Sequence, residues 1–196
     1  MRCQWVPQDS AIYRDYHDEE WGKPAIDPVQ IFEKVCLEGF QSGLSWLTIL
    51  KKRDRFREVF SNFDFYEIAK YQEKDVERLL KDEGIIRHRG KIEAVINNAK
   101  KAIELEDADG IVPWFWSFAD EYHTSSKPKR PSEVPAVTKQ SEAMAKALKK
   151  MGWKFVGPTT MYAFMQSEGL VNDHTVGGEW FDSCEKLRSD RVSKAK

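Results

Sequence analysis

Hydrophobic positions along the chain recur three and four residues apart, and no stretch alternates apolar and polar residues as a half-buried strand does. Asp27 and Pro28 are typical of an N-cap and the first residue of a helix, because the aspartate side chain accepts from free backbone N–H groups. Ile31, Phe32 and Val35 then fall on one face. With no repeat or heptad elsewhere, the pattern predicts an all-α fold.

Capping residues and apolar spacing predict the other helices and one long loop. Ser45 is expected to cap one continuous helix whose apolar positions run through Leu47, Leu50 and Phe56 to Phe60. The longest loop is expected at 122–138, which is rich in serine, proline and lysine. Further helices are predicted after Asp64, near residue 74 (ending before Gly84), near Arg89, within 112–118, at Thr138 or Ser141 (ending at Gly152), and within 157–170.

Length and composition fit a single globular domain. The chain has 196 residues, of which 41% are hydrophobic and seven are tryptophan. The opening decapeptide MRCQWVPQDS shows no secretory signal, and no apolar run approaches a membrane span. Three cysteines give no disulfide framework. We therefore expect a soluble, cytoplasmic protein that does not associate with membranes; nothing in the sequence indicates more than a monomer.

The charge distribution is more informative than the net charge of −1. Five basic residues and one acid occupy KKRDRFR at 51–57, and three basic residues and a histidine occupy RHRGK at 87–91. KPKR at 127–130 is also basic, whereas acids gather at 104–109. Such runs are most often solvated helix faces, but segregated positive charge can also bind a polyanion. Charge alone leaves both interpretations open.

A helix–hairpin–helix is predicted over residues 75–104. Its two amphipathic helices flank a turn at 83–91 that contains two glycines. Glycine allows a sharp turn and a close approach, and the free N–H groups that open the second helix form an anion site. Such a hairpin binds a DNA phosphate without reading the base. The residues expected to contact DNA here are Gly84, Arg87, Arg89, Gly90 and Lys91.

The segment CLEGFQSGLSW, residues 36–46, combines a carboxylate with an aromatic side chain across a glycine-broken bend. Glu38 and Trp46 flank Gly39, Gly43 and a serine, where an ordinary amphipathic helix would continue. A lone glutamate at a helix end is usually solvated, and a tryptophan is usually part of the core. Spacing alone does not distinguish this interpretation from a ligand pocket.

Several motifs together resemble the bacterial 3-methyladenine DNA glycosylase I family. They are YHDEEWG (16–22), LEGFQSGLSWLTILKKR (37–53), GIIRHRGKI (84–92), WSF (116–118) and KFVGPTTMYAFMQSEGLVNDH (154–174). Their order and spacing match the family to about residue 177. The resemblance implies one domain, 1–196, with the helix-hairpin-helix DNA glycosylase fold. Its helical core is expected at about 25–170, its terminal segments at 1–24 and 171–186, and a disordered tail at 187–196.

The resemblance also implies an activity and the residues that carry it. Family members flip 3-methyladenine out of double-stranded DNA and cleave its N-glycosidic bond. Because this base is cationic, the enzyme needs a pocket that accepts a positive charge. Glu38 would accept hydrogen bonds from the base and favour its charge, while aromatic rings would stack on it. By this resemblance the catalytic residues are Glu38, Tyr16 and Trp46, and the other pocket residues are Trp21 and Trp5. Leu44 would fill the gap in the duplex, and Gly43 would let the backbone approach the DNA closely.

The family also implies one structural zinc ion that joins the two chain ends through two cysteines and two histidines. Cys3, His17 and His174 match three of the ligand positions. The fourth is normally a cysteine four residues after the last histidine, where this chain has Gly178. Cys184 is the available substitute, and loss of the site is the alternative. Cys36 is expected to be an inert core thiol.

Three other functions are compatible with parts of the sequence. A glycosylase of different lesion specificity would use Asp107 or Asp109, which fall about twenty residues beyond the hairpin. A non-catalytic module would bind damaged DNA without releasing a base. An enzyme acting on a small metabolite would use the aromatic pocket but would have no use for the hairpin. The lesion range beyond 3-methyladenine depends on pocket shape and does not follow from the sequence.

Overall fold

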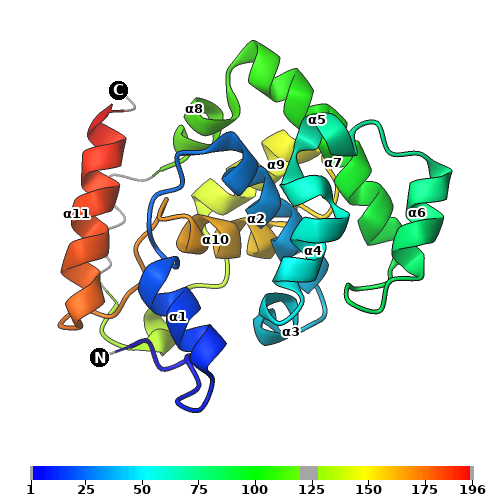
Figure 1. Cartoon of the computed structure of the whole chain (residues 1–196). Coiled ribbons are helices and arrows are strands. Elements are labelled where there is room, and N and C mark those ends of the chain that lie inside the picture. The colour runs from blue at the N-terminus through cyan, green and yellow to red at the C-terminus, as the bar shows by residue number, and fades with distance from the viewer. Residues whose placement is uncertain (1, 120–127, 195–196) are drawn as a thin grey trace.

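The computed structural model describes residues 2–119 and 128–194, which form helices and loops and contain no strand (Figure 1). The all-α prediction is confirmed. None of the described helices is long and apolar enough to cross a membrane. Residues 122–127 of the predicted loop, which include His123, fall outside the described residues. The α-helices are α1 (Ala11–Glu19), α2 (Pro28–Gln41), α3 (Trp46–Leu50), α4 (Arg53–Val59), α5 (Phe65–Ile68), α6 (Glu73–Leu80), α7 (Arg89–Ala108), α8 (Ile111–Trp116), α9 (Lys139–Lys150), α10 (Pro158–Ser167) and α11 (Glu179–Lys194). Two 3-10 helices are η1 (Ser61–Phe63) and η3 (Pro131–Glu133).

Side-chain caps start the helices where the sequence placed them. Asp27 Oδ1 accepts from Gln30 N at 2.8 Å, which fixes the start of α2. Ser45 Oγ accepts from Thr48 N at 3.2 Å and starts α3. At α9 both candidate residues take part, because Thr138 and Ser141 each accept from the other's backbone N–H. These caps are local in sequence, so they can be predicted without tertiary contacts.

The structure divides one of the predicted helices into two separate helices, α3 and α4. The helix expected from Ser45 to Phe60 ends at Leu50 and restarts at Arg53, so the prediction of a continuous element is wrong. The break changes the direction of the chain and lets Phe56 and Phe60 pack on Phe40 of α2, with ring centroids 4.6 and 6.1 Å away. Packing of these large rings is worth more than one continuous run of backbone hydrogen bonds.

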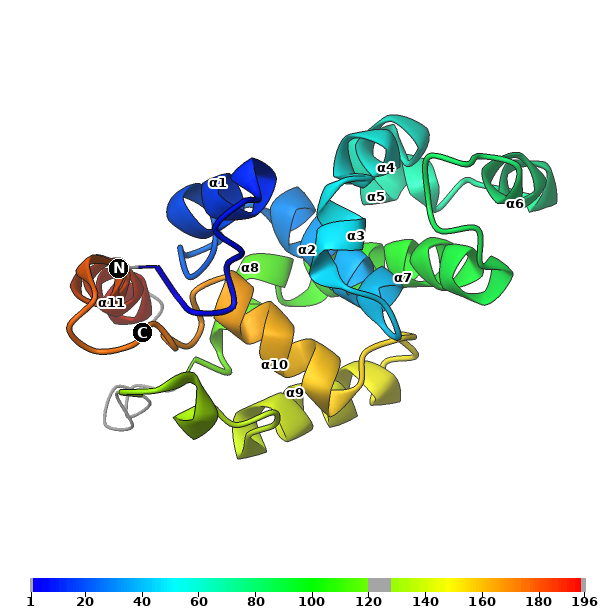
Figure 2. The same cartoon turned by 90° about the horizontal axis from the view of Figure 1, so that it is seen from below.

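Helix α2 forms the centre of the molecule. It packs against α3, α7, α8 and α10, which surround it in Figures 1 and 2. Ile31, Phe32 and Leu37 are fully buried, as the apolar pattern predicts. Two charged residues of the same helix, Lys34 and Glu38, are also buried. Burying a charge is costly unless it is paired or serves a ligand, so these two side chains mark the functional region.

The N-terminal segment and the start of α11 lie on the same side of the molecule, where α1 and α11 are neighbours (Figures 1 and 2) and the ring centroids of His17 and Trp180 are 5.6 Å apart. The prediction that residues 187–196 are disordered is wrong for 187–194, which belong to α11. The helix forms because its few inward side chains pack well: Arg188 is buried and pairs with Glu185 at 3.0 Å, and Val192 packs on the core. Residues 195 and 196 lie outside the described residues.

Candidate active site

A cavity of about 320 Å³ lies between α1, α2, α3 and α10. Its size suits a ligand of the dimensions of a nucleobase. The structure brings all five predicted pocket residues to its wall, although they come from three separate parts of the chain. Among the described residues the lining consists of Cys3, Trp5, Tyr13, Tyr16, Trp21, Glu38, Gln41, Trp46, Val134, Ala163, Gln166, Asp173 and Thr175.

Glu38 is the unpaired acid of this cavity. Glu38 is 5% exposed. Among the described residues, none donates a hydrogen bond to its carboxyl group and none forms an ion pair with it. Burial raises the pKa of this carboxyl group to about 8, because a buried carboxylate loses its hydration. The charge of Lys34 opposes the increase and that of Glu168 adds to it. A cation placed in the cavity would therefore gain a partner that the protein itself leaves unsatisfied.

Aromatic side chains form the walls around Glu38. The ring centroids of Tyr16 and Trp46 lie 5.4 Å apart, and those of Trp5 and Trp21 lie 4.9 Å apart. Trp46 is the first residue of α3, and the Ser45 cap fixes its position next to the C-terminal half of α2. Ring faces attract a flat cation both by stacking and by cation–π interaction. The arrangement can hold a planar, positively charged ring.

Sequence reasoning missed two charged residues behind these walls. Lys34 Nζ lies 3.4 Å from Glu168 Oε1 and donates to Tyr16 Oη, also at 3.4 Å. The signal for Lys34 was present, because a lysine interrupts the apolar face of α2 one turn before Glu38. Nothing local indicates Glu168, which reaches α2 only after the chain has folded.

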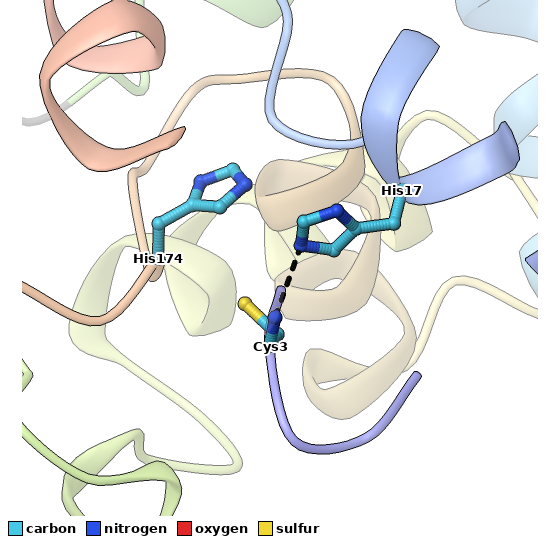
Figure 3. A group of neighbouring side chains, drawn as sticks. All are labelled: Cys3, His17 and His174. Atoms are coloured by element: carbon cyan, nitrogen blue, oxygen red, sulfur yellow. Dashed lines mark hydrogen bonds between the residues drawn. The ribbon is translucent and has the colours of Figure 1, made fainter. Parts of the chain in front are cut away.

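Three buried side chains near the cavity form a potential metal site (Figure 3). The nearest donor atoms of Cys3, His17 and His174 all lie within 4.8 Å of one another. Each residue comes from a different segment: the N-terminal stretch, α1 and the chain after α10. His17 Nδ1 is 2.9 Å from Asp18 Oδ1, and His174 Nδ1 is 3.0 Å from Asn172 Oδ1. These contacts assign the ring proton to Nδ1 in both rings. Nε2 of His17 then accepts from the backbone N–H of Cys3 at 3.3 Å (Figure 3), whereas Nε2 of His174 has no hydrogen-bond partner among the described residues.

Cys184 lies beside this cluster but not within it. It is carried by α11. A Cβ atom on Gly22 would be 2.7 Å from His174 Cε1 and 3.6 Å from Cys184 Sγ, so both side chains flank the same glycine. Burial raises the pKa of the Cys3 thiol to about 11, and burial raises that of Cys184 as well. Cys36 is a residue of α2 and is buried in the core, as expected of an inert thiol.

The turn between α2 and α3 joins the helix that carries Glu38 to the helix that begins with Trp46. Gly43 has φ of +81° with open space around it, and Leu44 is 43% exposed. Lys91 was expected to bind phosphate, but it is buried, and its Nζ donates to the carbonyl oxygens of Phe40 and Ser42 at 2.8 and 2.6 Å. The lysine therefore holds this turn in place, because it satisfies carbonyls left free at the end of α2.

The hairpin between α6 and α7 retains part of the predicted anion site. The N–H groups of Arg89 and Gly90 have no acceptor among the described residues, whereas His88 Nδ1 accepts from Lys91 N at 3.2 Å and caps α7. Arg89 pairs with Glu73, Glu77 and Glu93, so its charge is compensated. Arg87 has one exposed partner and keeps its guanidinium at the surface. Gly84 has room for no side chain, because a Cβ atom there would lie 2.4 Å from Arg55 Cγ.

Comparison with known proteins decides which family this site belongs to. A family model described as methyladenine glycosylase matches residues 5–181. The chain belongs to the methyladenine glycosylase family. It is 51% identical over 177 residues to DNA-3-methyladenine glycosylase 1 of Escherichia coli, covering 90% of this chain and 94% of that protein.

Solved structures of this family share the fold. A crystal structure of 3-methyladenine DNA glycosylase I superposes with a TM-score of 0.85 at 48% identity, covering 91% of this chain and 98% of that one. A variant of 3-methyladenine DNA glycosylase I in complex with 3-methyladenine has a TM-score of 0.82 at 32% identity, covering 89% and 94%. The predicted fold class is confirmed.

The acids of the rival glycosylase hypothesis lie away from the cavity. Asp107 and Asp109 are exposed at the C-terminal end of α7, and neither belongs to the lining. In this methyladenine glycosylase they are solvated residues of a helix end, which was the simpler of the two interpretations.

Proposed function

We propose that this methyladenine glycosylase flips 3-methyladenine out of double-stranded DNA and hydrolyses its N-glycosidic bond, releasing the free base and leaving an abasic site. One observation carries the proposal: a buried carboxylate with no protein partner, Glu38, faces a cavity enclosed by aromatic rings. In a pocket of this kind a planar cation would pair with the carboxylate and stack on the aromatic rings. We further propose that the enzyme acts as a monomer in the cytoplasm.

The positive charge of the lesion supplies most of the chemistry. Methylation at N3 makes the base electron-poor, so its bond to the sugar is already weak and no strong acid is needed. In the cavity the cation meets the carboxylate of Glu38 in a desolvated setting, where their attraction exceeds that in water. Preferential binding of the extruded cation, together with exclusion of neutral bases, accounts for selectivity and raises kcat/KM. When the N-glycosidic bond breaks, its electron pair goes to the base, which leaves as a neutral molecule, and water adds to the sugar.

Ring faces select against normal adenine by the same logic. Tyr16 and Trp46 present π-surfaces whose attraction for a cation is roughly 0.5–2 kcal/mol per contact, an attraction that a neutral base does not receive. Trp5 and Trp21 also line the cavity. A neutral base would also leave the Glu38 carboxylate buried without a partner, which carries a further cost.

The DNA is handled by the two turns described above. Leu44 is suited to fill the space left in the duplex by the flipped nucleotide, because it is apolar and exposed on the turn that Lys91 holds in place. The free N–H groups at the start of α7, with Arg87, are suited to bind a backbone phosphate.

Product analysis tests the proposal directly. Incubation of the protein with methylated duplex DNA, followed by mass spectrometry of the released bases, should yield free 3-methyladenine and abasic sites in equal amounts. A shift in DNA mobility without base release would instead support a non-catalytic binding module. Release of a different damaged base in preference to 3-methyladenine would support the rival specificity.

We also propose that one structural zinc ion joins Cys3, His17 and His174, with Cys184 as the fourth ligand. Two observations support the fit: His174 Nε2 is buried without a hydrogen-bond partner among the described residues, and thiol and imidazole donors suit zinc. The ion would supply structure alone, fixing His17 and thereby the adjacent pocket residue Tyr16.

Metal analysis tests this second proposal. Purified protein should contain one zinc per chain, and Cys184→Ser should lower the zinc content, whereas Cys36→Ser, the matched change at the remaining cysteine, should not. Protein free of zinc after expression in zinc-supplemented medium would refute it.

A further inference from the structure

A buried ion pair lies directly behind the pocket walls. Lys34 Nζ is 3.4 Å from Glu168 Oε1, and both side chains are almost completely buried. The ammonium also lies against the two aromatic rings, 4.7 Å from the Tyr16 centroid and 5.2 Å from that of Trp46. Gln30 donates to the other oxygen of Glu168 at 3.3 Å. Neither charged residue lines the cavity, so the rings separate the pair from any bound base.

A lysine in this place calls for an explanation. A positive charge behind a pocket for a cation should oppose binding, and a buried ion pair usually contributes little to stability. The geometry resolves this conflict. Lys34 lies one helical turn before Glu38 on the same face of α2, and the pairing with Glu168 cancels its charge as seen from the cavity. Once ionised, Glu38 is the one uncompensated negative charge at the cavity, and it matches the single positive charge of the lesion.

We infer that Lys34 is a positioning residue for the reaction: its ammonium, paired with Glu168, favours the ionised form of Glu38 that a cationic base requires. This inference rests on the proposed function and adds a residue to it. Without the lysine, α2 and the chain after α10 would bring two carboxylates together in a buried space. One of them would then take up a proton, because like charges cannot both remain ionised there.

The other titratable groups around Glu38 are few. Helix α1 contributes Tyr13 and Tyr16, and the chain after α10 contributes Glu168 and Asp173. Asp173 is engaged by Tyr162 and Gln166, whose side chains donate to its Oδ2 at 2.5 and 2.8 Å.

Further from the pocket, Glu20 at the end of α1 is paired with Arg53 of α4 at 2.6 Å. Burial by itself would lower the pKa of Lys34, but the neighbouring Tyr16, Glu168 and Glu38 raise it above its usual value, so the lysine carries its charge. Lys34 is therefore the one cation among the described residues that faces Glu38 from within the core.

The pH dependence of excision distinguishes this role from simple packing. When kcat/KM is plotted against pH, its fall on the acid side (the acid limb) reports the ionisation of Glu38 in the free enzyme, and the midpoint of this limb is the pKa. Lys34→Met should move its midpoint to higher pH by about one unit or more, since the opposite charge is lost. Glu168→Gln should move it to lower pH, and the unpaired lysine should lower the plateau rate. The double variant Lys34→Met/Glu168→Gln should have a midpoint between those of the two single variants.

Lys91→Met is the matched control, because Lys91 is also a buried lysine but holds carbonyl groups away from Glu38. Its acid limb should keep the wild-type midpoint whatever its rate. If Lys34→Met does not fold, Glu168→Gln alone still tests the inference, since it should move the midpoint of the acid limb to lower pH. An unchanged midpoint in both single variants would overturn the inference. So would covalent trapping of Lys34 on DNA by borohydride, which would show a neutral, nucleophilic amine.

A titration that needs no activity separates this inference from the proposed function. Carbon-13 NMR of the Glu38 carboxyl group, assigned with Glu38→Gln, measures its pKa in the DNA-free protein. The midpoint should rise in Lys34→Met and fall in Glu168→Gln even if the wild-type protein released no 3-methyladenine. Equal midpoints in all three proteins would contradict the inference, while absence of base release by the wild type would contradict only the proposed function.

Discussion

At the scale of single residues, Glu38 combines the largest functional role with a cost in stability. Its carboxyl group has a pKa near 8 in the folded protein, because burial disfavours the charge, compared with 4.5 for an ordinary glutamate. Between these values the unfolded chain releases a proton that the folded protein retains. Raising the pH across this range therefore favours the unfolded state. The acid that prepares the pocket for a cation therefore lowers the stability of the folded protein as the pH rises.

The substitution Glu38→Gln should consequently stabilise the protein while it abolishes function. At pH 9 we expect a gain of ~1–3 kcal/mol in the free energy of unfolding, since the amide carries no charge to bury. At pH 4 the gain should vanish, because both side chains are then neutral in both states. Urea unfolding at the two pH values measures it. Glu142→Gln on the exposed face of α9 controls for the substitution itself, and a loss of stability at pH 9 would contradict the account.

Individual residues also show what the sequence could and could not predict. The caps Asp27, Ser45 and Thr138 were predictable, because each bonds a backbone group within three residues. The pocket residues followed from a motif whose meaning comes from a family. The pairing of Lys34 with Glu168 has no local signal, since its two members meet only in the folded protein. Lys91 was assigned to DNA because exposure cannot be read from a basic run.

At the scale of elements, the α2–α3 turn is the part that acts on the duplex. Its conformation depends on Gly43 in the left-handed region and on Lys91 from α7. Rigid support matters, because a wedge held loosely would lose the energy needed to keep a nucleotide unstacked. The two turns that contact DNA in this proposal are thus joined by one buried lysine.

Leu44→Ala should lower single-turnover excision from duplex DNA by about tenfold or more, because unstacking costs a few kcal/mol per step. Excision from single-stranded DNA should change much less. Leu187→Ala is the matched control, since Leu187 of α11 is exposed to a similar degree, 45% against 43%. Equal effects of Leu44→Ala on both substrates would contradict the wedge role.

Arg87→Ala should weaken binding to duplex DNA of any sequence and reduce the slope of log affinity against log salt by about one, as expected for loss of a single phosphate contact. Fluorescence anisotropy with undamaged DNA at several salt concentrations measures the slope. Lys186→Ala provides the control, because α11 lies at the opposite end of the molecule from the hairpin (Figures 1 and 2). An unchanged slope for Arg87→Ala would remove the hairpin from the interface.

At the scale of the whole molecule, the fold brings its N-terminal segment and the chain from Asn172 into α11 together beside the pocket. The cluster of Cys3, His17 and His174 sits at this junction, where Trp180 of α11 packs on the His17 ring with centroids 5.6 Å apart. Helices α1 and α11 were not predicted. Ser10 makes no side-chain cap for α1, and the inward face of α11 includes Cys184 and Arg188, which do not read as apolar. The central helices, by contrast, follow from ordinary apolar spacing.

Removal of the proposed zinc should loosen this junction and lower the melting temperature by roughly 5 °C or more, because the ion closes a loop across nearly the whole chain. Differential scanning calorimetry before and after treatment with a chelator measures the shift, and added zinc should restore it. A melting temperature unaffected by chelation of zinc-loaded protein would contradict a structural role for the metal.

The most direct test of the central claim is the single-turnover rate of 3-methyladenine release from one defined duplex by the wild-type protein and by Glu38→Gln. Because the amide keeps the shape of the side chain and removes its charge, the account predicts a fall of at least about 100-fold, as for other charges preorganised toward a reacting group. The variant should remain folded and at least as stable as the wild type at the same pH. A folded Glu38→Gln protein that released 3-methyladenine within about threefold of the wild-type rate would contradict the claim that this carboxylate recognises the charged base.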